Sequence, residues 1–212
     1  MAIQDATILM LTSLAETRDN ETGNHILRTQ NYVKALAQHL SNHPRFSEYL
    51  TEHIIYMLYK CAPLHDIGKV GIPDHILLKP GRLTPEEFET MKTHAVLGRN
   101  AIMSAEKTLG MNVDFLGIAK EIAYYHHEKW DGTGYPEGLS GDDIPISARL
   151  MAMADVYDAL ISKRVYKEPM THEEAVAIIV KGKGLHFDPD MVDKFIEIHT
   201  KFHDIALQYS DF

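Results

Sequence analysis

The sequence predicts an all-α fold, a helical bundle of about seven to nine helices, because helical signals recur along the chain and strand signals do not. Apolar residues repeat at helical spacing in successive segments, and three of the expected helices open with residues typical of N-caps. No segment of strand length alternates apolar and polar residues between hairpin turns. We therefore expect residues 1–212 to form a single domain, in keeping with the chain length.

Two amphipathic helices are expected at the start of the chain, over residues 3–19 and 22–40, where apolar side chains recur at intervals of three and four. The next clear helix start is Thr84. Pro85 occupies the first helical position, and Glu87 stands where a capping box places its acidic partner. This spacing predicts that a helix begins directly after Thr84.

Further helix signals follow in the second half of the chain. Residues 115–125 carry an apolar face, and residues 148–161 are apolar almost all round. Thr171 and Glu174 repeat the capping box, and an Asp-Pro pair opens a last helix over about 188–207.

One long stretch, residues 128–146, lacks these signals and is rich in Gly, Pro and Asp. At about 19 residues it exceeds the usual connection, and loops of that length are commonly functional or disordered. The composition leaves both alternatives open for this stretch.

The composition excludes several classes of protein. A single cysteine excludes a disulfide scaffold and a four-cysteine zinc site. No apolar run approaches the roughly 18 residues of a membrane span, and the first ten residues lack a signal-peptide pattern. The net charge of −9 makes the chain a poor general DNA binder. We expect a cytoplasmic protein with no membrane span and no DNA partner, in which bound metal ions would attract an anionic substrate.

Histidine and carboxylate side chains recur in patterns that suit metal binding. Glu21 and His25 lie four residues apart, so they share one helix face. The adjacent His65 and Asp66 could reach one ion near a helix end or bend, and the flanking proline and glycine favour such an irregularity. Either pair alone is more often a surface pair than a ligand pair.

Four more side chains strengthen the interpretation as a metal site. His94 is expected near the last turn of the capped helix, and His126 and His127 end an apolar helix just before the long loop. Asp155 lies in an apolar helix, where an uncompensated buried carboxylate would be costly. It therefore needs a metal, several donors or a salt bridge to an arginine, and for Asp155 alone the salt bridge and the metal are equally favoured. Asp158 fits a structural or supporting role better than that of a ligand.

These side chains make eight candidate ligands without sulfur: Glu21, His25, His65, Asp66, His94, His126, His127 and Asp155. That number exceeds the needs of one ion and suffices for two or three. Mixed imidazole and carboxylate ligands suit Fe and Mn, and less specifically Zn, Ni and Co. Two or three divalent ions would leave the site positive, as an anionic phosphate ester requires. Lys69 could then stabilise charge on a phosphate oxygen.

The same residues carry a resemblance to a known family. Residues 65–69 (HDIGK) and 72–74 (IPD) resemble the HD superfamily of metal-dependent phosphohydrolases. Residues 126–136 (HHEKWDGTGYP) resemble the extension of its HD-GYP subfamily, and residues 137–145 and 154–160 continue the pattern in the expected order. The resemblance extends over nearly the whole chain.

The resemblance implies an all-helical cyclic di-GMP phosphodiesterase with a two- or three-metal centre, most often of iron or manganese, with Ni, Co, Zn and Mg as alternatives. It implies that the eight side chains above are the metal ligands, and that Glu21 goes with a third metal. Asp66 and Lys69 are then catalytic, with Lys69 on the phosphate side. Tyr135 of the Gly-Tyr-Pro loop is expected near the substrate.

Three arginine and lysine residues are further candidates for substrate binding. The resemblance implies a nucleotide-binding role for Arg164 and Lys167, although Val165 replaces the proline that is usual in this segment and should loosen the loop. Arg149 could contact phosphate or pair with a carboxylate, and the sequence does not separate these alternatives.

The expected reaction is hydrolysis of cyclic di-GMP to linear pGpG, and on to GMP, by attack of a metal-bound hydroxide at phosphorus. The alternatives are a catalytically weak cyclic di-GMP receptor, a regulator that binds diguanylate cyclases (GGDEF proteins) through the Gly-Tyr-Pro loop, and an HD hydrolase of another nucleotide. The filled ligand positions favour the enzyme, and a bacterial, cytoplasmic protein fits its substrate.

The leading residues 1–20 allow two interpretations. They could continue a signalling helix from a missing sensory or receiver domain, and their apolar stripe could then support a homodimer. We favour a helix that packs on the core of its own domain.

Overall fold

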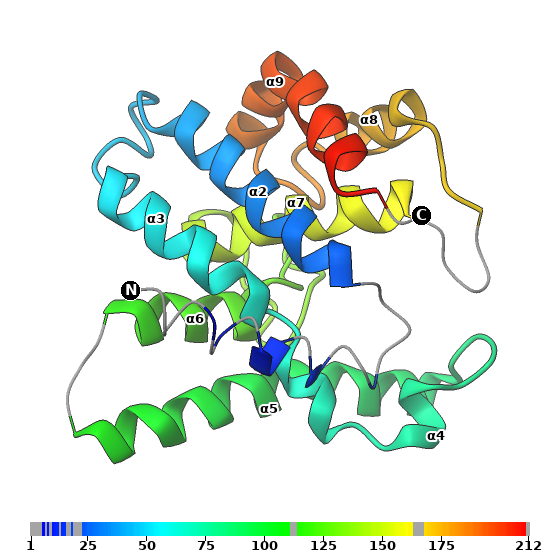
Figure 1. Cartoon of the computed structure of the whole chain (residues 1–212). Coiled ribbons are helices and arrows are strands. Elements are labelled where there is room, and N and C mark those ends of the chain that lie inside the picture. Colours follow the sequence, from blue (N-terminus) through cyan, green and yellow to red (C-terminus); the bar gives the residue numbers. More distant parts are fainter. Residues whose placement is uncertain are drawn as a thin grey trace.

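The computed structural model of the chain describes residues 23–110, 114–162 and 168–210, together with Ala6, Ile8, Met10, Leu11, Thr12, Leu14, Ala15 and Arg18. These residues form an all-α fold, which confirms the predicted class (Figure 1). Extended structure in the described ranges is limited to two isolated β-bridges. The α-helices and the short 3₁₀ helices (η) are α2 (Gly23–Leu40), α3 (Glu52–Cys61), η1 (Ala62–Leu64), η2 (Ile67–Gly71), α4 (Asp74–Leu77), α5 (Pro85–Leu109), α6 (Asp114–Tyr125), η3 (Gly141–Asp143), α7 (Ile146–Ile161), α8 (His172–Lys181) and α9 (Pro189–Gln208).

The predicted helix starts are confirmed. Thr84 and Thr171 both form complete capping boxes, in which the threonine hydroxyl and the glutamate carboxylate satisfy each other's backbone N–H groups. Asp188 caps α9 through the N–H of Asp190. The leading helix predicted over 3–19 falls largely outside the described residues.

The expected place of His94 was wrong. Helix α5 does not end near His94 but continues to Leu109, so the histidine lies in the middle of the helix. Gly98 lies within the helix, and the helix ends at Gly110, whose φ of 65° is the left-handed conformation that glycine adopts readily at a helix end. A long helix places the His94 backbone in the interior, where other elements pack on it.

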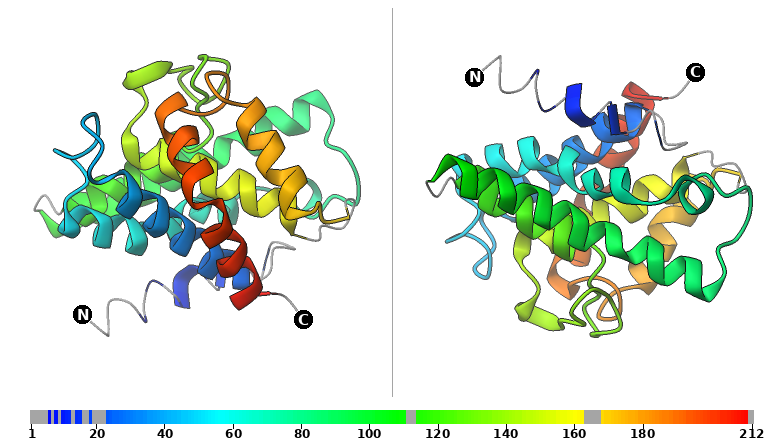
Figure 2. Two further views of the ribbon diagram at one scale, coloured as in Figure 1. Left: turned by 90° about the horizontal axis from the view of Figure 1, so that it is seen from above. Right: turned by 90° about the horizontal axis from the view of Figure 1, so that it is seen from below.

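Helix α7 lies at the centre of the core and is buried almost all round along residues 147–154. It packs on α2, α6 and α8, and α2 packs also on α3 and α9 (Figure 1). Helix α5 packs on α6 and η2, and it crosses the lower face of the molecule in the right-hand view of Figure 2. An aromatic cluster joins α2, α7 and α9, with Tyr32 stacked on Phe202 and both edge-on to Tyr157.

The irregularity expected around His65 and Asp66 is present. These two residues form the turn between η1 and η2, so their side chains are not constrained to the spacing of a continuous helix. Helix η2 can approach α5 closely because residue 68 is glycine. A Cβ at Gly68 would stand 1.9 Å from the backbone oxygen of His94 and 2.5 Å from the backbone nitrogen of Gly98. This contact brings the His-Asp turn next to His94.

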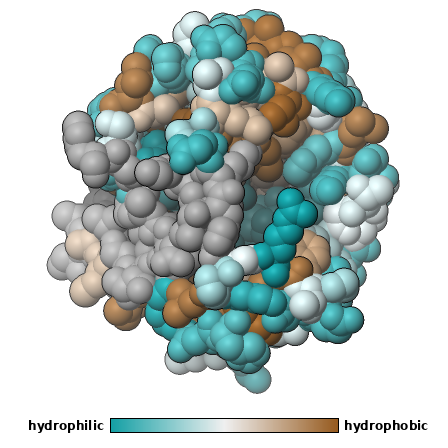
Figure 3. Space-filling view, turned by 90° about the vertical axis from the view of Figure 1, so that its right-hand side faces the viewer, coloured by the Kyte–Doolittle hydropathy of each residue, from teal (hydrophilic) through white to brown (hydrophobic). Residues whose placement is uncertain are grey.

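The surface of the described residues mixes hydrophilic and apolar side chains, as the face in Figure 3 shows outside the grey atoms. Among the helices that the structure describes, none combines the length and the apolar character needed to cross a bilayer.

Three histidines form a cluster between α8 and α9. The Nε2 atom of His172 lies 2.8 Å from Nδ1 of His199, and its ring stacks on His203 at 4.6 Å between centroids. Its Nδ1 atom lies 2.7 Å from the Tyr157 hydroxyl. Burial lowers the pKa of His172 below its ordinary value of 6.5, and His203 and His199 lower it further against the opposing effect of Glu173.

Gly68→Ala should strongly destabilise the fold, because the added methyl group meets backbone atoms that cannot move aside. We expect the free energy of unfolding to fall by about 3 kcal/mol in urea titrations. Gly117→Ala is the matched control, since a Cβ at this α6 position meets nothing within 4 Å. It should raise stability by about 0.5–1 kcal/mol. Equal changes in the free energy of unfolding for Gly68→Ala and Gly117→Ala would contradict the close packing of η2 on α5.

The histidine cluster predicts a loss of stability at acidic pH. Because the pKa of His172 is lower in the folded state, the unfolded chain binds more protons below pH 6.5, and stability falls as the pH drops through this value. His172→Gln removes the titrating group. The free energy of unfolding should therefore decrease less between pH 7.5 and 5.5 in this variant than in the parent. His53→Gln changes an exposed residue of α3. Its free energy of unfolding should decrease between pH 7.5 and 5.5 by as much as that of the parent.

Candidate metal centre

Seven of the eight predicted ligands come together where α2, α5, α6 and α7 meet the turn between η1 and η2. They form two groups. The first contains His25 of α2, His65 of the turn and Asp155 of α7. Nε2 of His25 lies 3.4 Å from Nε2 of His65 and 3.9 Å from Oδ1 of Asp155.

The second group contains Asp66 of the turn, His94 of α5, and His126 and His127 at the end of α6. Nε2 of His94 lies 3.1 Å from Nε2 of His127 and 3.3 Å from Oδ1 of Asp66. Nε2 of His126 lies 3.5 Å from the same carboxylate oxygen.

The Asp66 carboxylate joins the two groups. Its Oδ1 atom faces His94 and His126, while Oδ2 lies 3.4 Å from Nε2 of His65 in the first group. The ammonium group of Lys69 lies 2.8 Å from Oδ2. One carboxylate with an oxygen toward each group is the arrangement that a bridging ligand of two cations requires.

Hydrogen bonds at Nδ1 orient these imidazoles. A backbone carbonyl can only accept, so a histidine Nδ1 beside one carries the proton and leaves the Nε2 lone pair free to bind a cation. The pairs are His65 Nδ1 with Ala62 O at 2.9 Å, His94 Nδ1 with Met91 O at 2.7 Å, and His126 Nδ1 with Ile122 O at 2.9 Å. In each case the acceptor lies three or four residues earlier in the chain.

His25 is oriented by a carboxylate instead. Its Nδ1 atom lies 2.8 Å from Oδ2 of Asp158, and Asp158 in turn accepts two hydrogen bonds from the guanidinium of Arg28, at 2.7 and 3.0 Å. Both Asp158 and Arg28 are buried. This supporting role agrees with the place expected for Asp158. Arg28 had not been singled out, although its spacing of three from His25 puts both residues on one face of α2.

The electrostatics of the second group favour cation binding. Burial and the neighbouring His126 and His94 hold the pKa of His127 well below its ordinary value, and burial lowers the pKa of His94. Both imidazoles are therefore neutral near pH 7, the form that binds metal. Burial alone would raise the pKa of Asp66, but Lys69 and His65 outweigh it and keep the carboxyl ionised.

The residues present fit divalent cations. Two ligand atoms bound to one ion at about 2.1 Å stand about 3.0–3.4 Å apart, close to the separations above. Oδ1 of Asp66 and Nε2 of His126 are buried and lack a hydrogen-bond partner within the described part of the chain, which is costly unless a cation binds them. The Asp66 and Asp155 side chains keep 20% and 19% of their surface exposed, so the groups remain open to solvent.

Tyr135 lies beside the second group. Its ring stacks on His127 at 4.7 Å between centroids, and its backbone N–H donates to the His127 carbonyl. Three other predicted site residues, Glu21, Arg164 and Lys167, lie outside the described residues, so their roles stay predictions.

Arg149 does not join the two groups in the structure. Its guanidinium lies 2.7 Å from Asp188 and 2.9 Å from Asp142, and it stands over the Trp130 ring. Arg45 donates to the same two carboxylates. Of the two roles considered for Arg149, pairing with carboxylates is therefore the one that the geometry favours.

Glu128 anchors the long loop and was not predicted to do so. Its buried carboxylate accepts hydrogen bonds from the backbone N–H groups of Glu137, Gly138 and Leu139, at 2.7 to 3.1 Å. Because Glu128 directly follows His127, it ties the Gly-Tyr-Pro loop to the end of α6. A glutamate next to two ligand-like histidines was the signal available in the sequence.

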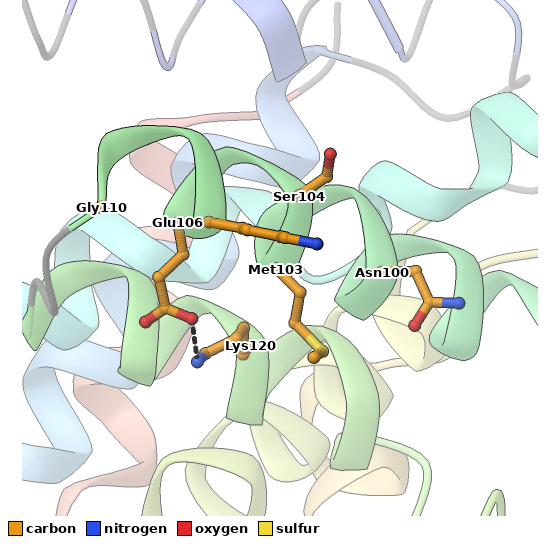
Figure 4. A pocket seen from close by; sticks show the side chains of 7 residues that line it. Asn100, Met103, Ser104, Glu106, Gly110 and Lys120 are labelled. Atoms are coloured by element: carbon orange, nitrogen blue, oxygen red, sulfur yellow. Dashed lines mark hydrogen bonds and ion pairs between the residues drawn. The ribbon is translucent and has the colours of Figure 1, made fainter.

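A separate shallow pocket lies on the outer side of α5 and α6. It is lined by Asn100, Met103, Ser104, Glu106, Lys107, Gly110 and Lys120, with an ion pair between Lys120 and Glu106 (Figure 4). None of the predicted site residues lines it, so it is not part of the candidate centre.

Comparison with known proteins gives two similar relatives from Vibrio cholerae. One, named "Probable cyclic di-GMP phosphodiesterase", is 61% identical over 99% of this chain and 47% of its own length. The other, named "Cyclic di-GMP phosphodiesterase", is 60% identical over 98% of this chain and 42% of its own length. The chain thus spans about half the length of these relatives.

Two solved structures share the fold. A cyclic GMP-AMP specific phosphodiesterase from V. cholerae superposes with a TM-score of 0.62 at 17% identity, over 98% of this chain and 53% of its own. An HDG"Y"P protein from Bdellovibrio bacteriovorus superposes with a TM-score of 0.57 at 19% identity, over 93% of this chain and 61% of its own.

A model of the HD domain family matches residues 10–191, most of the chain and every described residue of the two groups. The resemblance seen in the sequence is confirmed, and the chain belongs to the HD domain family.

Proposed function

We propose that the chain is a metal-dependent phosphodiesterase that hydrolyses cyclic di-GMP to pGpG and then to GMP. The observation that carries the proposal is the Asp66 carboxylate, whose two oxygens face two separate histidine groups. The names of the two V. cholerae relatives support the substrate. A single domain over residues 1–212 is part of the proposal, supported by a hydrophobic core that α2, α3, α6, α7, α8 and α9 share among the described residues.

The two groups would hold two divalent cations, iron or manganese by their nitrogen and oxygen ligands, with Asp66 between them. Glu21 is proposed to bind a third. When bound, such cations supply Lewis acidity at phosphorus and lower the pKa of water. The residues of the chain provide the geometry for this chemistry, since the Nδ1 hydrogen bonds fix the imidazoles before any substrate arrives.

Other side chains would act on the substrate. Lys69, whose ammonium group lies beside Asp66, would donate to a non-bridging phosphate oxygen and offset the charge that develops in the transition state. Tyr135 would border the substrate on the His127 side. The ligand groups are mostly buried. Solvent reaches them at the exposed part of the Asp66 and Asp155 carboxylates.

A second substrate deserves a direct comparison. The solved protein that superposes over nearly the whole chain is named for cyclic GMP-AMP, which differs from cyclic di-GMP in one base. The ligand groups act on the phosphodiester that both molecules share, so they do not select between them.

Asp66→Ala should abolish turnover and metal retention together, because it removes the carboxylate whose two oxygens face the two groups. Protein purified without oxygen and reloaded with iron or manganese is incubated with cyclic di-GMP and, separately, with 3′3′-cyclic GMP-AMP, and products are separated by chromatography. We expect kcat below about one hundredth of the parent value, with a matching fall in metal content by elemental analysis.

Asp193→Ala, at an exposed position of α9, is the control. It should keep the turnover and the metal content of the parent. A parent that cleaves only cyclic GMP-AMP would replace the proposed substrate, and an Asp66→Ala protein with normal turnover and metal would refute the proposed centre.

Asp158→Asn should weaken metal binding without removing a ligand, because the neutral amide no longer balances Arg28 or stabilises the proton on Nδ1 of His25. Supporting groups of this kind typically contribute about 10–100-fold to metal affinity, so chelator competition should show a loss in that range. Ser162→Ala is the control, since the Ser162 hydroxyl contacts the same carboxylate at 3.1 Å but not the histidine. Thermal unfolding of both variants separates this effect from misfolding, and equal metal affinity in both would rule out the orienting role.

A further inference from the structure

A row of aromatic rings leads from the candidate centre to the surface. Tyr135 stacks on the ligand-like His127 with an interplanar angle of 28°. The Phe88 ring lies edge-on to Tyr135 at 6.3 Å, and Phe88 is 47% exposed although it is large and apolar. Phe88 and His94 belong to the same helix, α5, so the row runs from the site toward the N-terminal end of α5.

A cation stands over this row. The ammonium group of Lys92 lies 5.6 Å from the centre of the Phe88 ring and 5.6 Å from that of Tyr135. It also pairs with the carboxylate of Glu89 at 2.6 Å, one turn of the helix earlier. Lys92 is only partly exposed, and its ammonium group lies at the same distance from both ring centres.

The position of Tyr135 is fixed by its own loop. Gly134 packs so closely on the end of α6 that a Cβ there would lie 2.4 Å from the backbone nitrogen of Lys129. The Glu128 carboxylate holds residues 137–139 on the other side of the tyrosine. Burial and the nearby Asp66 and Asp155 raise the pKa of the Tyr135 phenol, which places this side chain in the field of the candidate ligands.

We propose that Phe88, Lys92 and Tyr135 form a binding shelf for a guanine base of the cyclic dinucleotide. This inference rests on the proposed function, and it adds a base-recognition site to the metal centre. Exposed aromatic rings bind bases by stacking. The lysine ammonium can donate to the O6 and N7 acceptors of guanine, whereas adenine presents an amino donor at position 6. The shelf therefore favours guanine over adenine.

The test separates recognition of the base from chemistry at the phosphodiester. Phe88→Ala removes the exposed ring, and Lys92→Met removes the ammonium group while keeping a long apolar side chain. The kcat and KM values are measured for cyclic di-GMP, for cyclic di-AMP and for bis(4-nitrophenyl) phosphate, a phosphodiester without a purine. The controls are Met103→Ala and Lys107→Met, which change an exposed apolar and an exposed basic residue farther along α5.

We expect both variants to raise KM for cyclic di-GMP by about tenfold, the loss typical of one stacking or base-edge contact. Their kcat should stay within about threefold of the parent value, as should their turnover of bis(4-nitrophenyl) phosphate. Lys92→Met should also narrow the kcat/KM preference for cyclic di-GMP over cyclic di-AMP. The control variants should show none of these changes.

Two results would overturn the shelf while the proposed function stands. One is a KM for cyclic di-GMP equal to that of the controls. The other is a parallel loss on all three substrates, which would assign Phe88 and Lys92 to the support of the metal centre. If the parent hydrolyses none of the substrates, the proposed function is wrong. Calorimetric titration with cyclic di-GMP then decides the shelf, because a Kd unchanged in the variants would refute it and a tenfold weaker Kd would support it.

Discussion

The structure of the site depends on the contact between η2 and α5, which the missing side chain of Gly68 allows. Because of this contact, the turn that carries His65 and Asp66 lies against the middle of α5. The Asp66 carboxylate then reaches His94 with one oxygen and His65 with the other. If η2 and α5 were farther apart, the Asp66 carboxylate could not face both histidine groups. The two groups would then be separate clusters with no shared carboxylate between them.

Much of this arrangement could be predicted from the sequence, and for physical reasons. The capping boxes at Thr84 and Thr171 are local, since all their atoms lie within four residues. The candidate ligands stood out because a carboxylate within an apolar helix, such as Asp155, needs a partner, and because two adjacent histidines stand directly before a Gly-rich loop. The bend at His65 and Asp66 followed from the proline and glycine that flank them. Seven of the eight side chains that the motif positions implied lie together in the described part of the chain, and Glu21 lies outside it.

The rest depends on contacts between distant segments, which local patterns do not specify. Arg28 supports His25 only because Asp158, 130 residues later, packs against α2. Arg149 meets Asp188 because the start of α9 packs next to α7. Gly98, four residues after His94, is a residue type that often ends helices, but it lies inside α5 because η2 packs against it there. Glu128 shows the same limitation, since its three backbone partners are defined by the closure of the loop.

The anchors of the imidazoles have a consequence for metal exchange. His65, His94 and His126 take their orientation from main-chain carbonyls of their own segments, so this orientation does not depend on an ion. The folded chain should therefore load and release cations without a folding step, unlike domains that fold only around their metal. Affinity by itself would then favour ions late in the first transition series. The ion found in the protein would instead reflect which cations are available to the folded chain and how quickly they exchange, so that one sequence could hold different metals under different growth conditions.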